Sequence, residues 1–381
     1  MDNNNKPGRI GSLQAVRAMA FTGIFLCHAI NTFPGEGMLY YVLFKSPGVW
    51  GVSVFFVLSG FLMTYSYWNR PIGKKFKDSF LFMIRKIRKL YPLHLLMLLA
   101  GSVYWLMMQR ETISGILKKL AITVPLIQTW FPVGYQGINS VAWYLSVCVF
   151  LYFCFPCLLG FIKRIENIKL LFAVISGIFI IQLLIGYGVF RYTLIDMKWI
   201  TYCHPVFRLG DFTIGGFMAS LYIKRKASAG PKRSVSKLWG SVLEMISVAL
   251  SIATCIFYTY SSDESVWYTY TCLFIPSSVL LVYVFSMGSG IISGLLTNRF
   301  TLWLAAISPY AFLIHRLVIY YLQAFTKYII HCESVNILMV IVVSFGITVI
   351  AVLMYQKFEK AVIQQLTIPK SGSRTSSRRS E

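Results

Sequence analysis

Two ionisable residues, Arg17 and His28, lie inside the first strongly apolar stretch of the sequence. They are eleven positions apart, which on an α-helix places both side chains on one face with about 16 Å between them along the axis. An imidazole can take up or release a proton near neutral pH, and a guanidinium binds anions. Ionisable groups in apolar membrane segments are costly and usually functional. The pair therefore predicts a polar stripe that lines a cavity between helices; the alternative is a packed structural histidine and an arginine that reaches the membrane interface.

A second basic cluster occupies residues 85–90, where Arg85 and Arg88 are three positions apart. Side chains with this spacing share a helix face, and paired guanidinium groups suit phosphate oxygens better than lysines do. The cluster predicts either a phosphate site or a basic loop that contacts anionic lipid.

Three weaker signals follow along the chain. Arg208 and Asp211 have the spacing of an ion pair on one helix, and His315 lies in the apolar run 308–316. Gly51 and Gly60 fall in another apolar run, where small residues let helix backbones approach closely. The eight cysteines show no metal-ligating spacing, so no metal site is predicted.

The elements that must position these residues are membrane helices. Apolar residues are 57% of the chain, charged residues only 13%, and the mean hydropathy is +0.66, whereas soluble domains carry roughly 25% charged residues. A span needs roughly 20 mostly apolar residues. The sequence thus predicts an all-α integral membrane bundle with ten spans at 13–33, 48–68, 91–109, 141–162, 168–189, 206–223, 238–260, 267–286, 302–324 and 336–357. The shorter apolar stretch 120–133 contains two prolines and predicts a re-entrant or interfacial segment.

The distribution of charge gives the orientation. If the N-terminus is cytoplasmic, 26 of the 36 Lys and Arg residues fall in cytoplasmic segments and seven in external ones. This bias predicts that both termini are cytoplasmic. The net charge of +23 lies in short loops without a nucleic-acid-binding module, so no nucleic acid partner is expected. One membrane domain is predicted over residues 1–360, followed by a disordered basic cytoplasmic tail at 361–381.

Several of these runs occur together in one known family. They resemble the membrane-bound acyltransferase-3 family, whose members O-acylate surface polysaccharides and related glycans. The run GVSVFFVLSGF at 51–61 resembles the family's GVDLFFVLSGF signature and is the most specific match. The other matching runs are Arg17-x10-His28, Arg85-x-x-Arg88 before Tyr91-Pro92, Trp143-Tyr-Leu-Ser146 with Phe155-Pro156, and the blocks at 208–212 and 308–315.

The resemblance implies an enzyme of the cell membrane, an O-acetyltransferase without the added esterase-like domain of some members. Its donor would be acyl-CoA, most commonly acetyl-CoA, with no permanently bound cofactor, and its acceptor a surface glycan or a lipid-linked precursor. His28 would act as general base or acyl carrier, with His315 as a second participant. Arg17 would guide the pantetheine arm. The residues expected to hold the CoA phosphates are Arg85 and Arg88, and those expected to shape the site are Arg208, Asp211, Trp143 and Ser146.

Two positions depart from the family pattern. Cys148 stands where the family often has Glu, and Ser53 stands at its acidic position. The rival function is a transporter or a flippase for lipid-linked glycans without acyl transfer. That rival is disfavoured because the sequence shows no paired half-repeats with interrupted helices. Direct transfer and transfer through an acyl-histidine both remain open.

Overall fold

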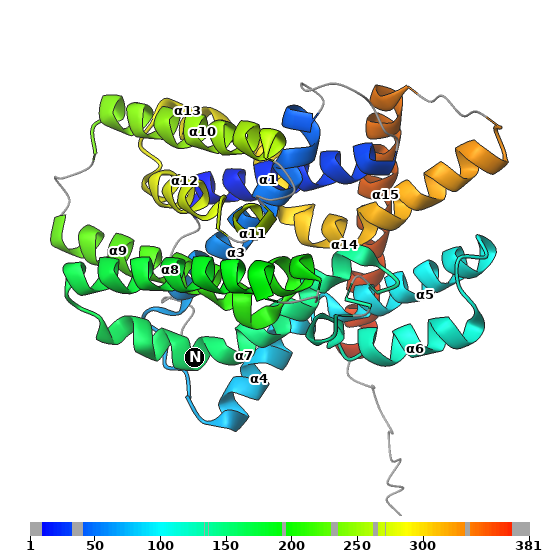
Figure 1. Cartoon of the computed structure of the whole chain (residues 1–381), viewed down its shortest axis with the longest axis horizontal. Coiled ribbons are helices and arrows are strands. Elements are labelled where there is room, and N and C mark those ends of the chain that lie inside the picture. The colour runs from blue at the N-terminus through cyan, green and yellow to red at the C-terminus, as the bar shows by residue number, and fades with distance from the viewer. Residues whose placement is uncertain are drawn as a thin grey trace, which may run out of the picture.

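The computed structural model describes residues 10–32, 41–132, 134–135, 137–192, 196–229, 235–261, 266–270, 272–331 and 336–367. Within these ranges the regular elements are all helices, which confirms the predicted all-α fold (Figure 1). The longer ones are α1 (Gly11–Thr32), α3 (Ser46–Tyr67), α4 (Phe76–Ile87), α5 (Tyr91–Met107), α6 (Ile113–Thr123), α7 (Trp143–Arg164), α8 (Ile168–Tyr192), α9 (Pro205–Ala229), α10 (Lys237–Tyr260), α12 (Ile275–Met287), α14 (Arg299–Tyr328) and α15 (Ile337–Thr367). Short helical turns join them: η2 (Tyr41–Lys45), η3 (Gln128–Trp130), η4 (Ser140–Ala142), η5 (Trp199–Cys203), α11 (Val266–Thr269) and α13 (Ile291–Leu296).

The centre of the bundle is built around α1 and α3. Helix α3 packs against α1 on one side and α9 on the other, and α1 also packs against α14. A methyl group added at Gly51 would lie 2.6 Å from the carbonyl oxygen of Ala20, and one at Gly60 would overlap the carbonyl of Phe212. These glycines therefore permit the close backbone approach that the sequence predicted.

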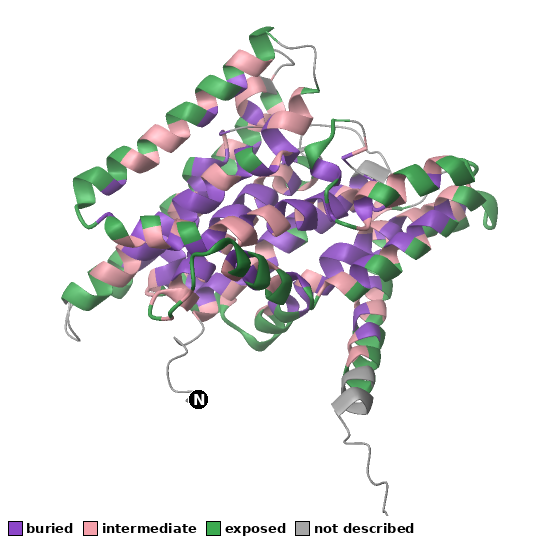
Figure 2. Cartoon of the chain, turned by 90° about the horizontal axis from the view of Figure 1, so that it is seen from below, coloured by how far each residue is buried: buried purple, intermediate pink, exposed green. Residues whose placement is uncertain are grey.

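The outer helices expose apolar side chains. Only 11% of the most apolar window of α8 is buried, against 78% in Val42–Tyr67, which includes α3. Figure 2 shows the same gradient, with buried residues concentrated in the middle and exposed ones along the peripheral helices. Exposed faces rich in Ile, Leu and Phe suit contact with lipid.

Seven described helices are long and apolar enough to cross a membrane, or eight if the bent pair α4 and α5 forms one span. The ten predicted spans are thus not confirmed. Helix α9 has 25 residues; Arg208 and Asp211 are buried inside the bundle, whereas its three consecutive basic residues, 224–226, lie near its partly exposed C-terminal end. The predicted span 267–286 covers most of the short helix α11 and of the 13-residue helix α12, so its described residues do not form one long helix.

Three further features lie near the ends of helices. Helices α4 and α5 meet at an angle of 60°, close to the basic cluster. The stretch 120–133 ends α6 and then forms a turn and η3, and it does not form a long helix. Helix α15 continues to Thr367, and the rest of the predicted tail lies outside the described residues.

Candidate functional site

Two cavities lie along α1, and the two ionisable residues of that helix fall one in each. The His28 cavity has a volume of about 240 Å³, and its lining includes Lys45, Trp143, Lys198 and Arg316. The Arg17 cavity has a volume of about 450 Å³ and is lined also by Lys86, Lys89 and Cys148. The predicted polar stripe is therefore divided between two spaces.

His28 lines this cavity, and its principal contact is with a second histidine, the buried His315 of α14, which does not line the cavity itself. His28 Nδ1 lies 2.7 Å from Nε2 of His315, and the rings are nearly parallel, with centroids 5.0 Å apart. His315 is fully buried, and its Nδ1 lies 3.1 Å from the carbonyl oxygen of Ala311 one turn earlier on α14. Residues 287 positions apart are thus joined in one hydrogen-bonded chain.

The direction of this chain follows from its end. The Ala311 carbonyl can only accept, so Nδ1 of His315 carries the hydrogen. In the neutral pair Nε2 of His315 is then an acceptor, and Nδ1 of His28 donates to it. The lone pair of the His28 ring is consequently on Nε2, the nitrogen a general base uses. His315 fixes the tautomer of His28, as a hydrogen-bonded orienting group does in other catalytic sites.

The local sequence of α14 explains why His315 holds this position. Pro309 lacks the amide hydrogen that would satisfy the carbonyl of Ala305, and the hydroxyl of Ser308 donates to that carbonyl instead at 3.0 Å. The helix therefore continues past the proline to His315. Arg316 then donates to the backbone oxygen of His28 at 3.0 Å, which fixes α14 against α1.

The Arg17 cavity is a cationic space whose lysines lie against aromatic rings. Lys86 Nζ lies 4.5 Å from the centroid of the Tyr67 ring, and Lys89 Nζ lies 5.3 Å from that of Tyr310. Arg17 donates to Gln14 at 3.3 Å. Among the described residues, no Asp or Glu lines this cavity, so it suits an anionic ligand.

Comparison with known proteins assigns the chain to a family. The family profile described as an acyltransferase domain matches residues 10–356. The chain belongs to the acyltransferase-3 family.

Two relatives are similar to this acyltransferase-3 chain over different lengths. The protein named acyltransferase MdmB, from Streptomyces mycarofaciens, is 25% identical over 336 residues, covering 82% of this chain and 80% of that protein. The peptidoglycan O-acetyltransferase OatA of Listeria monocytogenes serovar 1/2a is 24% identical over 183 residues, covering 44% of this chain and 27% of that protein. No solved structure matches the chain.

The residues predicted to hold the CoA phosphates in this acyltransferase-3 protein, Arg85 and Arg88, line neither cavity. Arg85 and Arg88 are exposed, and Nε of Arg85 donates to the carbonyl of Leu81 on its own helix at 3.1 Å. The cavity is lined instead by Lys86, which follows the buried Phe82 by four positions on α4, and by Lys89, an exposed residue of the turn between α4 and α5. This periodicity was the available signal for the inward face of α4.

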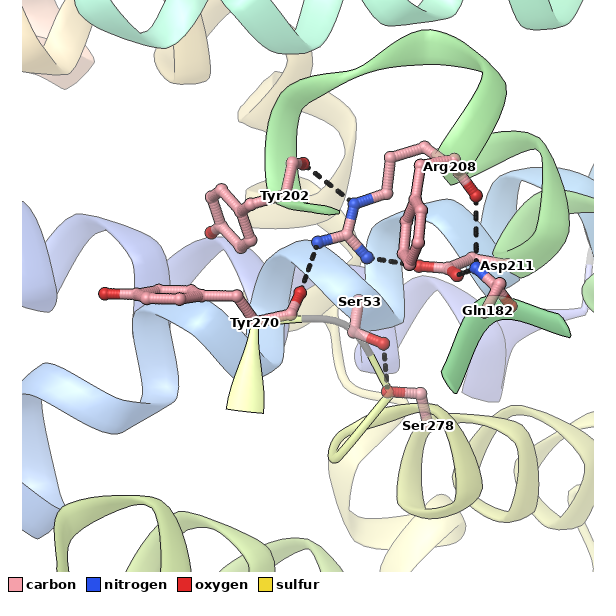
Figure 3. A network of polar contacts seen from close by, with 8 residues as sticks. Ser53, Gln182, Tyr202, Arg208, Asp211, Tyr270 and Ser278 are labelled. Atoms are coloured by element: carbon pink, nitrogen blue, oxygen red, sulfur yellow. Dashed lines mark hydrogen bonds and ion pairs between the residues drawn. The ribbon is translucent and has the colours of Figure 1, made fainter. Parts of the chain in front are cut away.

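The predicted pair Arg208 and Asp211 forms a buried network beside the His28 cavity (Figure 3). Arg208 donates to Asp211 at 2.6 Å and to the backbone oxygens of Tyr202 and Tyr270 at 2.8 and 3.1 Å. Gln182 donates to the second oxygen of Asp211 at 2.8 Å. Tyr202 and Tyr270 line the His28 cavity, whereas Arg208 and Asp211 do not, so the network holds the wall in place.

Of the remaining predicted site residues, one lines a cavity and the other does not. Trp143 lines the His28 cavity directly. Ser146 is buried away from both cavities and donates to the carbonyl of Leu126 at 2.7 Å, which ties α7 to the turn before η3. Of the two departures from the family pattern, Cys148 lines the Arg17 cavity, and Ser53 accepts a hydrogen bond from Ser278 at 3.2 Å.

Five cationic residues that line the cavities were absent from the sequence-based site. They resemble ordinary loop or interfacial cations in the sequence: Lys45, Lys86, Lys89, Lys198 and Arg316. Of these residues, Arg316 was the easiest to identify from the sequence, because it is a charged residue directly after His315 inside an apolar run.

Proposed function

We propose that this membrane acyltransferase transfers an acyl group from acyl-CoA, with acetyl-CoA as the simplest donor, to a hydroxyl of a surface polysaccharide or its lipid-linked precursor. Two observations carry the proposal: His28 lines one cavity and is oriented by the buried His315, and a cationic cavity lies further along the same helix. A base needs a defined tautomer, and an acyl-CoA needs cations for its phosphates. The two cavities supply these requirements separately.

The proposed chemistry starts at Nε2 of His28. This nitrogen removes the proton of the acceptor hydroxyl as its oxygen attacks the thioester carbonyl carbon. The new C–O bond forms, the C–S bond breaks, and the proton on His28 passes to the CoA sulfur to give the free thiol. The cation that forms transiently on His28 is shared through the hydrogen bond to His315. Direct transfer needs no covalent enzyme intermediate.

The donor enters, in this proposal, from the Arg17 cavity. That cavity contains residues of the segment 69–90, which the charge bias predicts to be cytoplasmic, where acyl-CoA is made. Lys86 and Lys89 would contact the phosphates at the cavity, and Arg85 and Arg88 would contribute from the exposed face of α4. The acceptor would occupy the His28 cavity, where Lys45 and Lys198 come from segments predicted to be external.

The direct test is acyl transfer in membranes that contain the protein and its own acceptor glycan. Acetyl-CoA labelled in the acetyl group is added, and both the released CoA and the label in the glycan fraction are measured. We expect both to appear in equal amounts and to be absent from membranes of a deletion strain. Glycan translocation without CoA release would contradict acyl transfer and support a flippase.

A further inference from the structure

Among the residues that the structure describes, the two cavities share one lining residue, Phe312 of α14. Its ring lies 6.2 Å from that of Phe55 and 5.3 Å from that of Tyr144, centroid to centroid, and both of these residues line the Arg17 cavity. On the other side the ring lies 5.9 Å from His315. Phe312 is only 8% exposed, so the wall is closely packed. Phe312 therefore stands between the space assigned to the donor and the histidine pair.

The position of Phe312 constrains the shape of the donor. An acyl-CoA that enters from the Arg17 cavity leads with its acyl chain and trails its pantetheine and phosphates. Its thioester carbonyl must reach the acceptor oxygen beside His28, so the acyl chain beyond that carbonyl lies in the His28 cavity, between the Phe312 ring and the acceptor. That cavity has about 240 Å³, which the acceptor must share. A long chain would collide with the aromatic wall or displace the acceptor.

We propose that Phe312 is a specificity-determining residue that restricts the donor to short acyl groups, acetyl before butyryl. The inference rests on the proposed function, because it takes acyl-CoA as the donor. It adds that the size of the acyl group is read by an aromatic wall between the cavities. Discrimination at such a wall is steric, and one methylene in a tight apolar site changes relative kcat/KM by about tenfold or more.

A competition experiment tests this role. Membranes containing the protein and its acceptor receive equal amounts of acetyl-CoA and butyryl-CoA with different isotopes, and the ratio of the two labels in the glycan gives the ratio of kcat/KM values. The variants are Phe312→Leu and Phe312→Met, since apolar replacements of similar volume are tolerated best in a packed interior. The matched control is Phe21→Leu: Phe21 is buried and lies 6.0 Å from the His315 ring, but it lines neither cavity.

The wild type should strongly favour acetyl transfer. Both Phe312 variants should raise the butyryl-to-acetyl ratio by about tenfold, while Phe21→Leu should keep the wild-type ratio. An unchanged ratio in either Phe312 variant, or an equal rise in Phe21→Leu, would overturn the inference. So would loss of acetyl transfer in both inserted Phe312 variants, because a size wall is not required for the smallest donor. A wild type that uses neither CoA ester would instead refute the proposed function.

Discussion

The His28 cavity and the Arg17 cavity are built in different ways. His28 is held by a buried histidine at 2.7 Å and by a hydrogen bond from Arg316 to its own backbone oxygen. The cations of the Arg17 cavity are carried on long side chains, and Lys86 and Lys89 rest against aromatic rings. Proton transfer requires atoms placed within a few tenths of an ångström, whereas charge attraction tolerates movement. The comparison leads us to expect sharp losses from changes near His28 and graded losses from changes near Arg17.

The largest effect is expected for His28 itself. His28→Gln keeps hydrogen-bonding capacity but removes the base, so acyl transfer should fall by about 10²–10⁴-fold. His28→Ala should behave in the same way, and neither change burdens membrane insertion, because each removes a titratable group from an apolar helix. Acetyl transfer in membranes is measured at matched protein amounts, with thermal stability of the purified variants as the control. Wild-type transfer by either well-folded variant would exclude His28 as the base.

A large effect on folding is expected where the wall of the His28 cavity is fixed. Arg208 and Asp211 are 2% and 0% exposed, and Arg208→Met would leave the Asp211 carboxylate buried with Gln182 as its remaining side-chain partner. Breaking such a buried pair costs about 3–5 kcal/mol of stability. The double variant Arg208→Met with Asp211→Leu should recover part of that loss, because no unpaired charge remains. Detergent-solubilised proteins would be compared by denaturant unfolding; an unaffected single variant would mean that the pair is not required for the wall.

A smaller loss of rate separates the role of His315 from that of His28. His315→Leu removes the acceptor for Nδ1 of His28 and so releases its tautomer, which we expect to lower transfer by about 10²-fold. His315→Gln supplies a side-chain oxygen that can accept the same hydrogen bond, and should recover much of that loss.

A positioning role for His315 also makes a prediction for pH dependence. The profile of kcat/KM should shift in His315→Leu, because the group that shares the charge on His28 is gone. A purely structural role would predict equal losses for His315→Leu and His315→Gln and an unchanged profile. Rates are measured from pH 5 to 9 on protein shown to be folded, within roughly the range in which an imidazole titrates.

The same comparison explains what the sequence could and could not predict. Composition and hydropathy predicted a helical membrane bundle, and the eleven-residue spacing indicated a functional pair on the first helix. The pairing of His28 with His315 could not be predicted, because it depends on how α1 and α14 pack across 287 residues of sequence. Of the ten predicted spans, 91–109 forms part of a bent helix pair and 267–286 falls on short helices. The span predicted at 206–223 falls on α9, whose buried Arg208 and Asp211 lower its hydropathy.

The cations of α4 show a second limit. The sequence interpretation preferred Arg85 and Arg88 because guanidinium groups bind phosphate well. That choice depended on side-chain type, whereas the position of each residue around the helix decides which cations of α4 face the cavity. The buried Phe82 marks the inward face of α4, and Lys86, four positions later, lies on that face and lines the cavity. The bend between α4 and α5, which brings Lys89 against Tyr310, depends on tertiary packing and could not be predicted from the sequence.

The smallest effect is expected for the cations Lys86, Lys89, Arg85 and Arg88. It tests whether the Arg17 cavity tolerates movement of its charged side chains. Replacing Lys86 or Lys89 with Gln removes a charge-assisted contact, worth about 1.5–3 kcal/mol in favourable geometry. Because both side chains are flexible, we expect the lower end of this range, a rise in KM for acetyl-CoA of about tenfold per lysine.

Arg85→Gln and Arg88→Gln serve as matched controls, since they remove equal charge from the exposed face of the same cluster. Their KM values should rise less, and the rise should fade with added salt, because exposed charges are screened. The kcat should be retained in all four variants, since none of these residues reaches the histidine pair. A larger rise for the arginines than for the lysines would place the phosphates on the exposed face of α4, and a loss of kcat with KM unchanged would show that the cations act on the transfer step and not on donor binding.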